Sequence, residues 1–453
     1  MAAGDVTTGP GRPADGFLRK AVSRAGLSGL YDLTRRYGAR AGIFLANFGF
    51  AKAAAYLGPL VLARLLTSDL YGAIEFSWSS GMLAATVLGL GVSSALPQLM
   101  LLRRPMPAAD IMALFVAVPG ALALCLSLVL TIAGGSPAAV LVLNCIVLAM
   151  AQNHATAYAR TTSHRNLAVW IENLATHAVV LVAVVAALLH AAAMPAVAGG
   201  TAAAAFLMTA GAAFVVHRSR AADFAARART AIRLGLPLLI YGLCSTWVAV
   251  SGRFYVGATL GASELASYSV SFRLASALLI VHAILGTALF ARLYRLPARQ
   301  YDKYLCIYQA LIAAVSVLMI VSYPSVLPWL RLQAIDARGQ ADSIAIFPIV
   351  LLHVFGWNAW ATLEMRIARA RRGGQAAWRT LLVFSVFGLL LGALFWMNAL
   401  TLRTAAGLIS AQVVAGVAVQ LYVLWRRGMK MRRTGTALVL GAAAIMAAGW
   451  AMS

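Results

Sequence analysis

The stretch FLANFGFAKAAAYLGPLVLARLL, residues 44–66, decides the fold of this chain. It is almost wholly apolar, and it is long enough to cross the hydrocarbon core of a bilayer as an α-helix. Lys52 lies near its middle, where a charged side chain costs about 2.5–3.5 kcal/mol on insertion scales. The stretch therefore predicts a membrane-spanning helix in which Lys52 either has a function at that depth or is paired with a carboxylate.

The whole sequence has the same apolar character. Of its 453 residues, 62% are hydrophobic and 11% are charged, whereas about 25% of residues are charged in ordinary soluble domains. All four cysteines fall within apolar segments, so we interpret them as small core residues and expect neither a disulfide framework nor a metal site. This composition predicts an all-α polytopic membrane protein.

Thirteen apolar segments can be distinguished along the chain, so we predict about 12–13 transmembrane helices. The last segment is short and rich in alanine, which leaves open whether it spans the membrane or lies along the surface. The segments cover residues 41–62, 71–99, 111–132, 137–158, 166–189, 195–216, 235–258, 267–290, 304–330, 344–363, 380–397, 404–425 and 436–450.

The basic residues are distributed unevenly between the loops. If the N-terminus is cytoplasmic, most of the 37 Lys and Arg residues fall in cytoplasmic loops, and the outer loops hold only Arg64, Arg331, Arg338 and Arg403. Such a bias follows the positive-inside rule. The net charge of +24 therefore indicates contact with anionic membrane lipids, and its distribution argues against a nucleic-acid partner.

A short internal repeat relates the two halves of the chain. Ser68-Asp69-Leu70 aligns with Ser263-Glu264-Leu265 at an offset of 195 residues. Because six membrane crossings return the chain to its starting side, the repeat predicts two pseudo-symmetric six-helix bundles around a central cavity. The predicted divisions are a basic cytoplasmic segment (1–40), an N-terminal bundle (41–217), a cytoplasmic linker (218–234), a C-terminal bundle (235–427) and an additional hydrophobic segment (428–453).

Two stretches resemble a known family: LARLLTSDLYGAIEFSWSSGMLAATVLGLGVSSALPQLM (62–100) and SGRFYVGATLGASELASYSVSFRLASALLIVHAILGTALF (251–290). They are similar to the polysaccharide branch of the multidrug/oligosaccharidyl-lipid/polysaccharide (MOP) exporter superfamily. The resemblance implies a flippase that moves a polyprenyl-diphosphate-linked oligosaccharide to the outer leaflet of the bacterial inner membrane by alternating access. It also implies a polysaccharide polymerase and a chain-length regulator as partners.

Three cations lie within predicted spans: Lys52, Arg253 and Arg273. Tyr56 follows Lys52 by one helical turn and shares its face. The resemblance implies that cations at such positions line the cavity and bind the diphosphate, a task that suits arginine because its planar fork pairs bidentately with phosphate. We take these four as candidate substrate-binding residues. The alternatives are a structural ion pair for Lys52 and, for either arginine, a head group that reaches to the interface.

Two carboxylates, Glu75 and Glu172, also fall within predicted spans. Each is a candidate for ion coupling, because it can carry a proton or balance a cation in the cavity. A structural ion pair or an interfacial position remains the alternative for both. We expect no catalytic residue, no metal and no cofactor.

Other functions compete with the flippase. A cation or drug antiporter of the same superfamily would need a carboxylate in the first or seventh span, but residues 41–62 and 235–258 contain no Asp or Glu. A membrane-embedded glycan polymerase or ligase would need an extended outer loop, and the longest one predicted, residues 331–342, has only about a dozen residues. Neither a nucleotide-binding P-loop nor a channel filter motif is recognisable. We therefore expect a transporter and not an enzyme.

Overall fold

The computed structural model describes residues 28–97, 99–100, 108–162, 165–191, 193–219, 223–283, 293, 296–369 and 373–452. These residues form helices joined by short turns, and no strand occurs among them, so the all-α prediction is confirmed. The helices are α2 (Ser28–Leu65), α3 (Ser68–Leu88), α4 (Val92–Pro97), α5 (Ala109–Ile132), α6 (Pro137–Thr161), α7 (Arg165–Ile171), α8 (Leu174–Leu188), α9 (Met194–Arg218), α10 (Phe224–Thr259), α11 (Ala262–Ala275), α13 (Ala298–Val326), the 3₁₀ helix η2 (Leu327–Leu330), α14 (Ala337–Arg369), α15 (Gly373–Trp396), α16 (Leu402–Trp425) and α17 (Arg432–Met452).

The chain separates into two compact units, residues 1–51 and residues 52–453. Of the first unit, residues 1–27 lie outside the described residues. Residues 28–51 are helical and form the first part of α2. The predicted basic segment 1–40 therefore ends within a helix. The paragraphs that follow concern the second unit.

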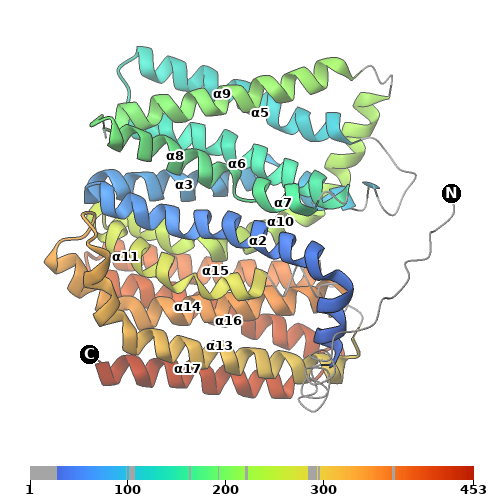
Figure 1. Cartoon of the computed structure of the whole chain (residues 1–453), viewed down its shortest axis with the longest axis vertical. Coiled ribbons are helices and arrows are strands. Elements are labelled where there is room, and N and C mark those ends of the chain that lie inside the picture. Colours follow the sequence, from blue (N-terminus) through green and yellow to red (C-terminus); the bar gives the residue numbers. More distant parts are fainter. Residues whose placement is uncertain are drawn as a thin grey trace, which may run out of the picture. The chain divides into compact units, whose positions relative to one another are not determined.

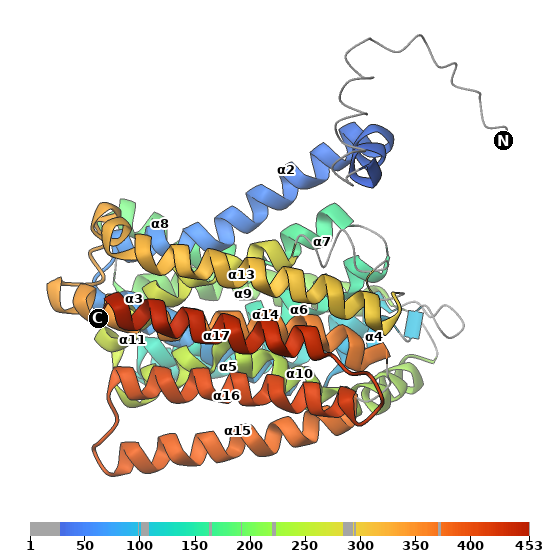
Figure 2. The same ribbon diagram turned by 90° about the horizontal axis from the view of Figure 1, so that it is seen from below.

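The second unit is built from helices that run side by side (Figures 1 and 2). At one end of it, α5, α6 and α9 pack against one another, and α3 and α8 pack on α6. At the other end, α14 packs against α16 and α17, and α17 also packs along α13. Between these groups, α3 contacts both α10 and α11. This order agrees with two related halves, but the bundle boundaries given above stay a prediction.

The described residues of all thirteen predicted segments lie mostly on helices, although some of these helices are broken by turns. In the described residues, ten helices are long and apolar enough to cross a membrane. The segment 71–99 is divided into α3 and α4 by a turn in which Leu90 and Gly91 have positive φ. The segment 166–189 is divided into α7 and α8 at Glu172 and Asn173. The segment 267–290 is described only to residue 283.

The last predicted segment forms a complete helix. α17 has 21 residues, is apolar enough to span a membrane, and packs along α13 and against α14. Because both neighbours are themselves candidate spans, this packing favours a spanning helix over one that lies on the surface.

Two glycines of the first family-like stretch, Gly72 and Gly91, lie against residues of the second half. Gly72, in the first turn of α3, lies so close to the backbone of Ala262 at the start of α11 that a Cβ at position 72 would overlap the Ala262 carbonyl. At the far end of α3, Gly91 lies equally close to Gly235 of α10. The starts of α3 and α11, where the two copies of the repeat lie, are therefore in contact, and glycine permits the close approach because it has no side chain.

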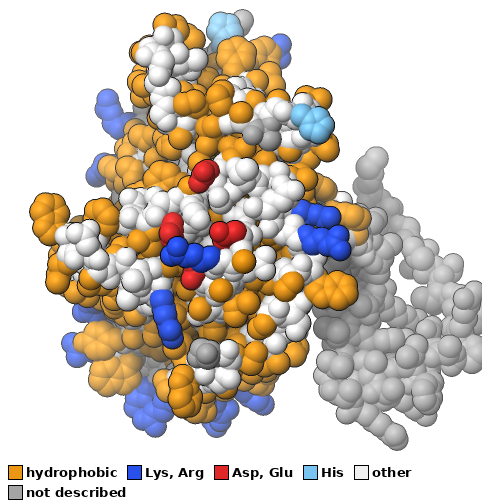
Figure 3. Space-filling model, turned by 90° about the vertical axis from the view of Figure 1, so that its left-hand side faces the viewer, with side chains coloured by type: hydrophobic (Ala, Val, Ile, Leu, Met, Phe, Trp, Pro, Cys, Tyr) orange, Lys and Arg blue, Asp and Glu red, His pale blue; other side chains and the backbone are white. Residues whose placement is uncertain are grey.

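Figure 3 shows the end of the molecule at which α3 and α14 begin. A few acidic and basic side chains are mixed there among uncharged polar groups, and apolar side chains surround them. Exposed basic residues mark the helix termini at the opposite end: Arg229, Arg233, Arg299, Lys303, Arg426 and Arg427. The uneven distribution of basic residues that the loops predict thus corresponds to a difference in positive charge between the two ends of the helices.

Candidate functional site

A cavity of about 560 Å³ lies at the end of the molecule where α3 and α6 end. Its walls come from α3, α4, α6 and α10, and from the turn between α7 and α8. The lining is mostly uncharged and polar. The polar residues are Thr86, Ser93, Ser94, Gln152, Asn153, His154, Thr156, Thr161, Ser245 and Thr246, and the charged ones are Arg160 and Glu172.

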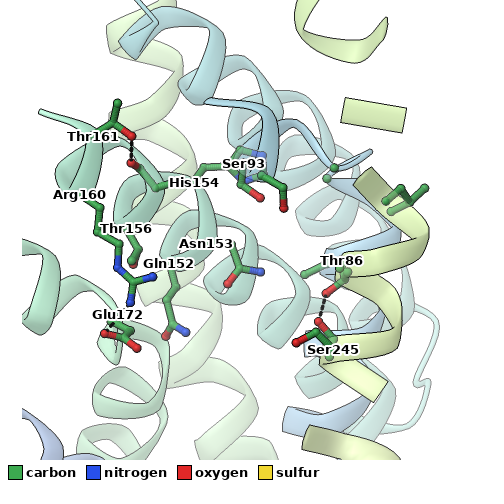
Figure 4. Close-up of a pocket in the computed structure, with 18 residues that line it drawn as sticks. Thr86, Ser93, Gln152, Asn153, His154, Thr156, Arg160, Thr161, Glu172 and Ser245 are labelled. Carbon is green, nitrogen blue, oxygen red and sulfur yellow. Dashed lines mark hydrogen bonds and ion pairs between the residues drawn. The ribbon is translucent and has the colours of Figure 1, made fainter. Parts of the chain in front are cut away.

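Two hydrogen bonds fix the walls of this cavity. The Oγ1 atoms of Thr86 and Thr246 are 3.0 Å apart and connect α3 to α10. The Gln152 side chain accepts a 3.0 Å hydrogen bond from the backbone N–H of Ala175 at the start of α8. Figure 4 shows Arg160, Glu172 and Gln152 grouped on one side of the cavity, with Thr86 and Ser245 on the other.

Glu172 bridges two cations at the edge of the cavity. Lys52 Nζ lies 3.1 Å from one carboxylate oxygen, and the Arg160 guanidinium lies 2.9 Å from the other. Lys52 is buried on α2, whereas 60% of the Arg160 side chain is exposed. Because a buried ion is stable only when it is paired, Glu172 accounts for the tolerance of Lys52 at this depth. The cluster of three ions keeps one net positive charge.

Glu75 holds a second cluster. Arg273 of α11 donates two hydrogen bonds to its carboxylate, at 3.0 and 2.9 Å, and Arg253 of α10 donates a third at 2.9 Å. Arg253 also donates to the Ala249 carbonyl at 3.1 Å, and its guanidinium lies over the ring of Phe272. The side chains of all three ions are at most 11% exposed. This cluster therefore joins α3 of the first half to α10 and α11 of the second.

Tyr56 lies between the two clusters. Its hydroxyl is near enough to Glu172 and to Arg273 for an electrostatic interaction with both. Along α10, Arg253 is seven residues beyond the cavity-lining Thr246, or about 10 Å at 1.5 Å per residue. Five of the six predicted site residues thus belong to two ion clusters, one at the cavity and one deeper in the molecule, and the sixth, Tyr56, interacts with a member of each. Neither cluster is a row of unpaired cations, and their roles in binding stay predictions.

Sequence reasoning missed several residues of this site. Arg160 falls in the predicted cytoplasmic loop between the segments 137–158 and 166–189, yet it lines the cavity. The run Gln152-Asn153-His154 on α6 places three consecutive polar side chains in a predicted span, and this pattern was the available signal. Glu364 of α14 lies outside the predicted span 344–363, and it interacts with Tyr241 of α10. No basic side chain of the described residues forms an ion pair with Glu364.

The fold is one that solved membrane transporters share. It is similar to the lipid II flippase MurJ in an inward closed conformation, with a TM-score of 0.56 and 11% identity, over 89% of this chain and 96% of that chain. It is also similar to an inward-facing multidrug resistance MATE family transporter of the MOP superfamily, with a TM-score of 0.53 and 15% identity, over 84% and 96%. The protein therefore has the MurJ- and MATE-like transporter fold, and the prediction of a multi-pass membrane protein is confirmed.

The family follows from the sequence. A family model described as polysaccharide biosynthesis protein matches residues 61–323, which is more than half of the chain. The chain belongs to this polysaccharide biosynthesis family. No curated protein matches the sequence. The family and the fold together confirm the resemblance to the polysaccharide branch of the MOP superfamily.

Proposed function

We propose that this protein is a flippase that moves a polyprenyl-diphosphate-linked oligosaccharide from the cytoplasmic to the outer leaflet of the bacterial inner membrane, for surface polysaccharide synthesis. One observation carries the proposal: an uncharged polar cavity ends on a cluster of ions with net positive charge. Membership of the polysaccharide biosynthesis family and the transporter fold support it.

The cavity lining suits a glycan joined to a diphosphate. Hydroxyl and amide side chains such as Thr86, Gln152 and Asn153 can exchange hydrogen bonds with sugar hydroxyls. Arg160 and Lys52 supply the positive charge that a diphosphate needs, and the arginine fork can bind two phosphate oxygens at once. Glu172 pairs with both cations, so an incoming diphosphate has to compete with this carboxylate.

The ion cluster around Glu75 can hold the two halves together on the outer side of the transporter. Glu75 joins α3 to α10 and α11, so the halves cannot separate at that level unless its three hydrogen bonds break. In our proposal the N-terminus is cytoplasmic, the cavity opens to the cytoplasm, and Arg253 and Arg273 pass from Glu75 to the diphosphate as the outer side opens. Glu75 and Glu172 then balance charge, and their use as proton carriers is the alternative.

Substitutions that keep or remove the positive charge of Lys52 test the proposal. Lys52→Arg keeps a cation beside Glu172, and we expect it to retain polysaccharide export in cells that lack the wild-type gene. Lys52→Met keeps the length of the side chain but not its charge, and we expect it to lose export by about tenfold or more at an unchanged protein level. Full export by the Met variant would overturn the role of Lys52 in substrate binding.

A further inference from the structure

A second concave surface lies between α13 and α17, far from the cavity in the sequence. It is a groove of about 560 Å³ whose lining includes Cys306, Ala310, Ala314, Ala437, Gly441 and Arg433. Figure 2 shows the two helices side by side along their length. Ala310, Ala314 and Ala444 are exposed, so the groove opens on the outer surface of the helices, where the acyl chains of the membrane lie.

Small side chains form the floor of the groove and larger ones flank it. Gly441 lies so close to Phe355 and Ala313 that a Cβ at this position would crowd both, so α17 is seated firmly on the helices behind it. Leu311, Leu318 and Leu440 are more than half exposed along the same two helices. The result is an apolar channel along the helix axes, a shape that fits one extended hydrocarbon chain.

One end of the groove is positively charged. Asp302 of α13 accepts hydrogen bonds from the backbone N–H of Thr434 at 2.9 Å, from its hydroxyl at 2.7 Å and from the backbone N–H of Arg433 at 3.2 Å. These bonds fix the first turn of α17 beside the start of α13. They bring Lys303, the neighbour of Asp302, to the same level as Arg433. Both cations are exposed, and neither forms an ion pair with a described residue.

The register of α13 places Lys303 on the face that lines the groove, about one turn before the lining residue Cys306. Residues 303, 306, 310 and 314 follow one another at helical spacing and share a face. The Asp302 carboxylate is buried and accepts hydrogen bonds from the start of α17, and among the described residues it forms no ion pair with either cation, so the three charges together leave one net positive charge. An apolar channel thus ends on two unpaired positive charges, at the level where lipid head groups lie.

We propose that this groove binds an anionic phospholipid, with one acyl chain between α13 and α17 and the phosphate at Lys303 and Arg433. Charge complementarity selects the occupant. A phosphatidylglycerol carries a net negative charge, whereas a phosphatidylcholine offers the same chains with a neutral head group. The site is independent of the transported substrate, because no residue of it lines the polar cavity.

The chain provides its own controls. A groove of about 700 Å³ between α5 and α9 is lined by residues such as Leu128, Ala203 and Phe206, and none of its lining residues is charged. It should hold acyl chains without selecting the head group. Arg403 is an exposed cation at the opposite helix end, and its removal matches the charge change of the test variants.

The test is native mass spectrometry of the full-length protein with dioleoylphosphatidylglycerol and dioleoylphosphatidylcholine. We expect the wild type to retain phosphatidylglycerol preferentially, and Lys303→Gln with Arg433→Gln to lose roughly fivefold in affinity for each cation. Ala314→Leu should lower retention of both lipids at this groove, whereas Arg403→Gln and Ala203→Leu should leave the preference unchanged. If the variants with Lys303→Gln and Arg433→Gln unfold at the same temperature as the wild type, misfolding is excluded as the cause of their lower lipid affinity.

Three results would overturn the proposal. Equal retention of the two lipids by the wild type would show that the cations do not select a head group. Retention of phosphatidylglycerol by the double Gln variant at the wild-type level would show that it binds elsewhere. If a polyprenyl phosphate displaced all bound phospholipid in a manner that depended on Arg433, the groove would belong to the substrate tail instead.

Discussion

Glu75 is the carboxylate of the more deeply buried of the two ion clusters. It neutralises Arg253 and Arg273 together, so Glu75→Gln leaves two buried guanidinium groups without a counter-ion. Removing one partner of a buried ion pair typically costs about 3–5 kcal/mol. Arg253→Met, in contrast, leaves a neutral pair in which Arg273 still donates two hydrogen bonds. We expect Glu75→Gln to lower the thermal unfolding temperature far more than Arg253→Met.

This ranking of unfolding temperatures can be measured by thermal unfolding of the purified variants in the same detergent. Arg273→Met should lie between the other two, because it leaves Glu75 with the single hydrogen bond from Arg253. If Glu75→Gln were as stable as Arg253→Met, the three residues would not form one charge-balanced cluster.

At the scale of helices, the contact between α3 and α11 depends on Gly72. A methyl group at this position would meet the carbonyl of Ala262, and backbone atoms cannot move aside cheaply. Gly72→Ala should therefore lower stability and reduce export. Gly407→Ala of α16 is the matched control, because nothing lies within 4 Å of its Cβ position. There the same change should raise helix stability by up to about 1 kcal/mol. Equal effects of the two substitutions in thermal unfolding and export would contradict the close approach.

The helices could be predicted because their signal is local in the sequence. Apolar runs and basic loops predicted thirteen segments whose described residues lie mostly on helices, and the repeat at Ser68 and Ser263 marked the starts of α3 and α11. The breaks within segments were missed, since a turn at Leu90 and Gly91 does not interrupt the apolar pattern.

The ion clusters could not be predicted to the same extent. Periodicity shows which face of a helix a residue occupies, but not which helix lies opposite. Glu75 and Arg273 are 198 residues apart, and Glu75 and Arg253 are 178 apart. The sequence therefore identified the charged residues but not their pairing, and it missed Arg160 because a cation at a helix end is an ordinary feature of a cytoplasmic loop.

At the scale of the whole molecule, the positive-inside bias predicts which end faces the cytoplasm. Single cysteines in a cysteine-free protein test this in intact cells. Ser263→Cys and Arg338→Cys lie on exposed positions at the end where α11 and α14 begin, and they should react with an impermeant thiol reagent added outside. Gln375→Cys and Arg427→Cys, exposed at the other end, should react only after permeabilisation. The opposite pattern would reverse the proposed direction of the cavity.

Voltage-driven flipping in proteoliposomes is the measurement that tests the account most directly. A diphosphate carries about two negative charges, and each is favoured by about 2.3 kcal/mol per 100 mV when it moves toward the positive side. We predict that the reconstituted protein translocates a polyprenyl-diphosphate oligosaccharide, and that a potassium gradient with valinomycin accelerates it when the destination side is positive. Lys52→Met should abolish the movement. Absence of translocation by the wild type would contradict the proposed function. Translocation that ignores voltage and responds only to an opposing proton or sodium gradient would contradict this driving force, and would make Glu75 and Glu172 the ion carriers.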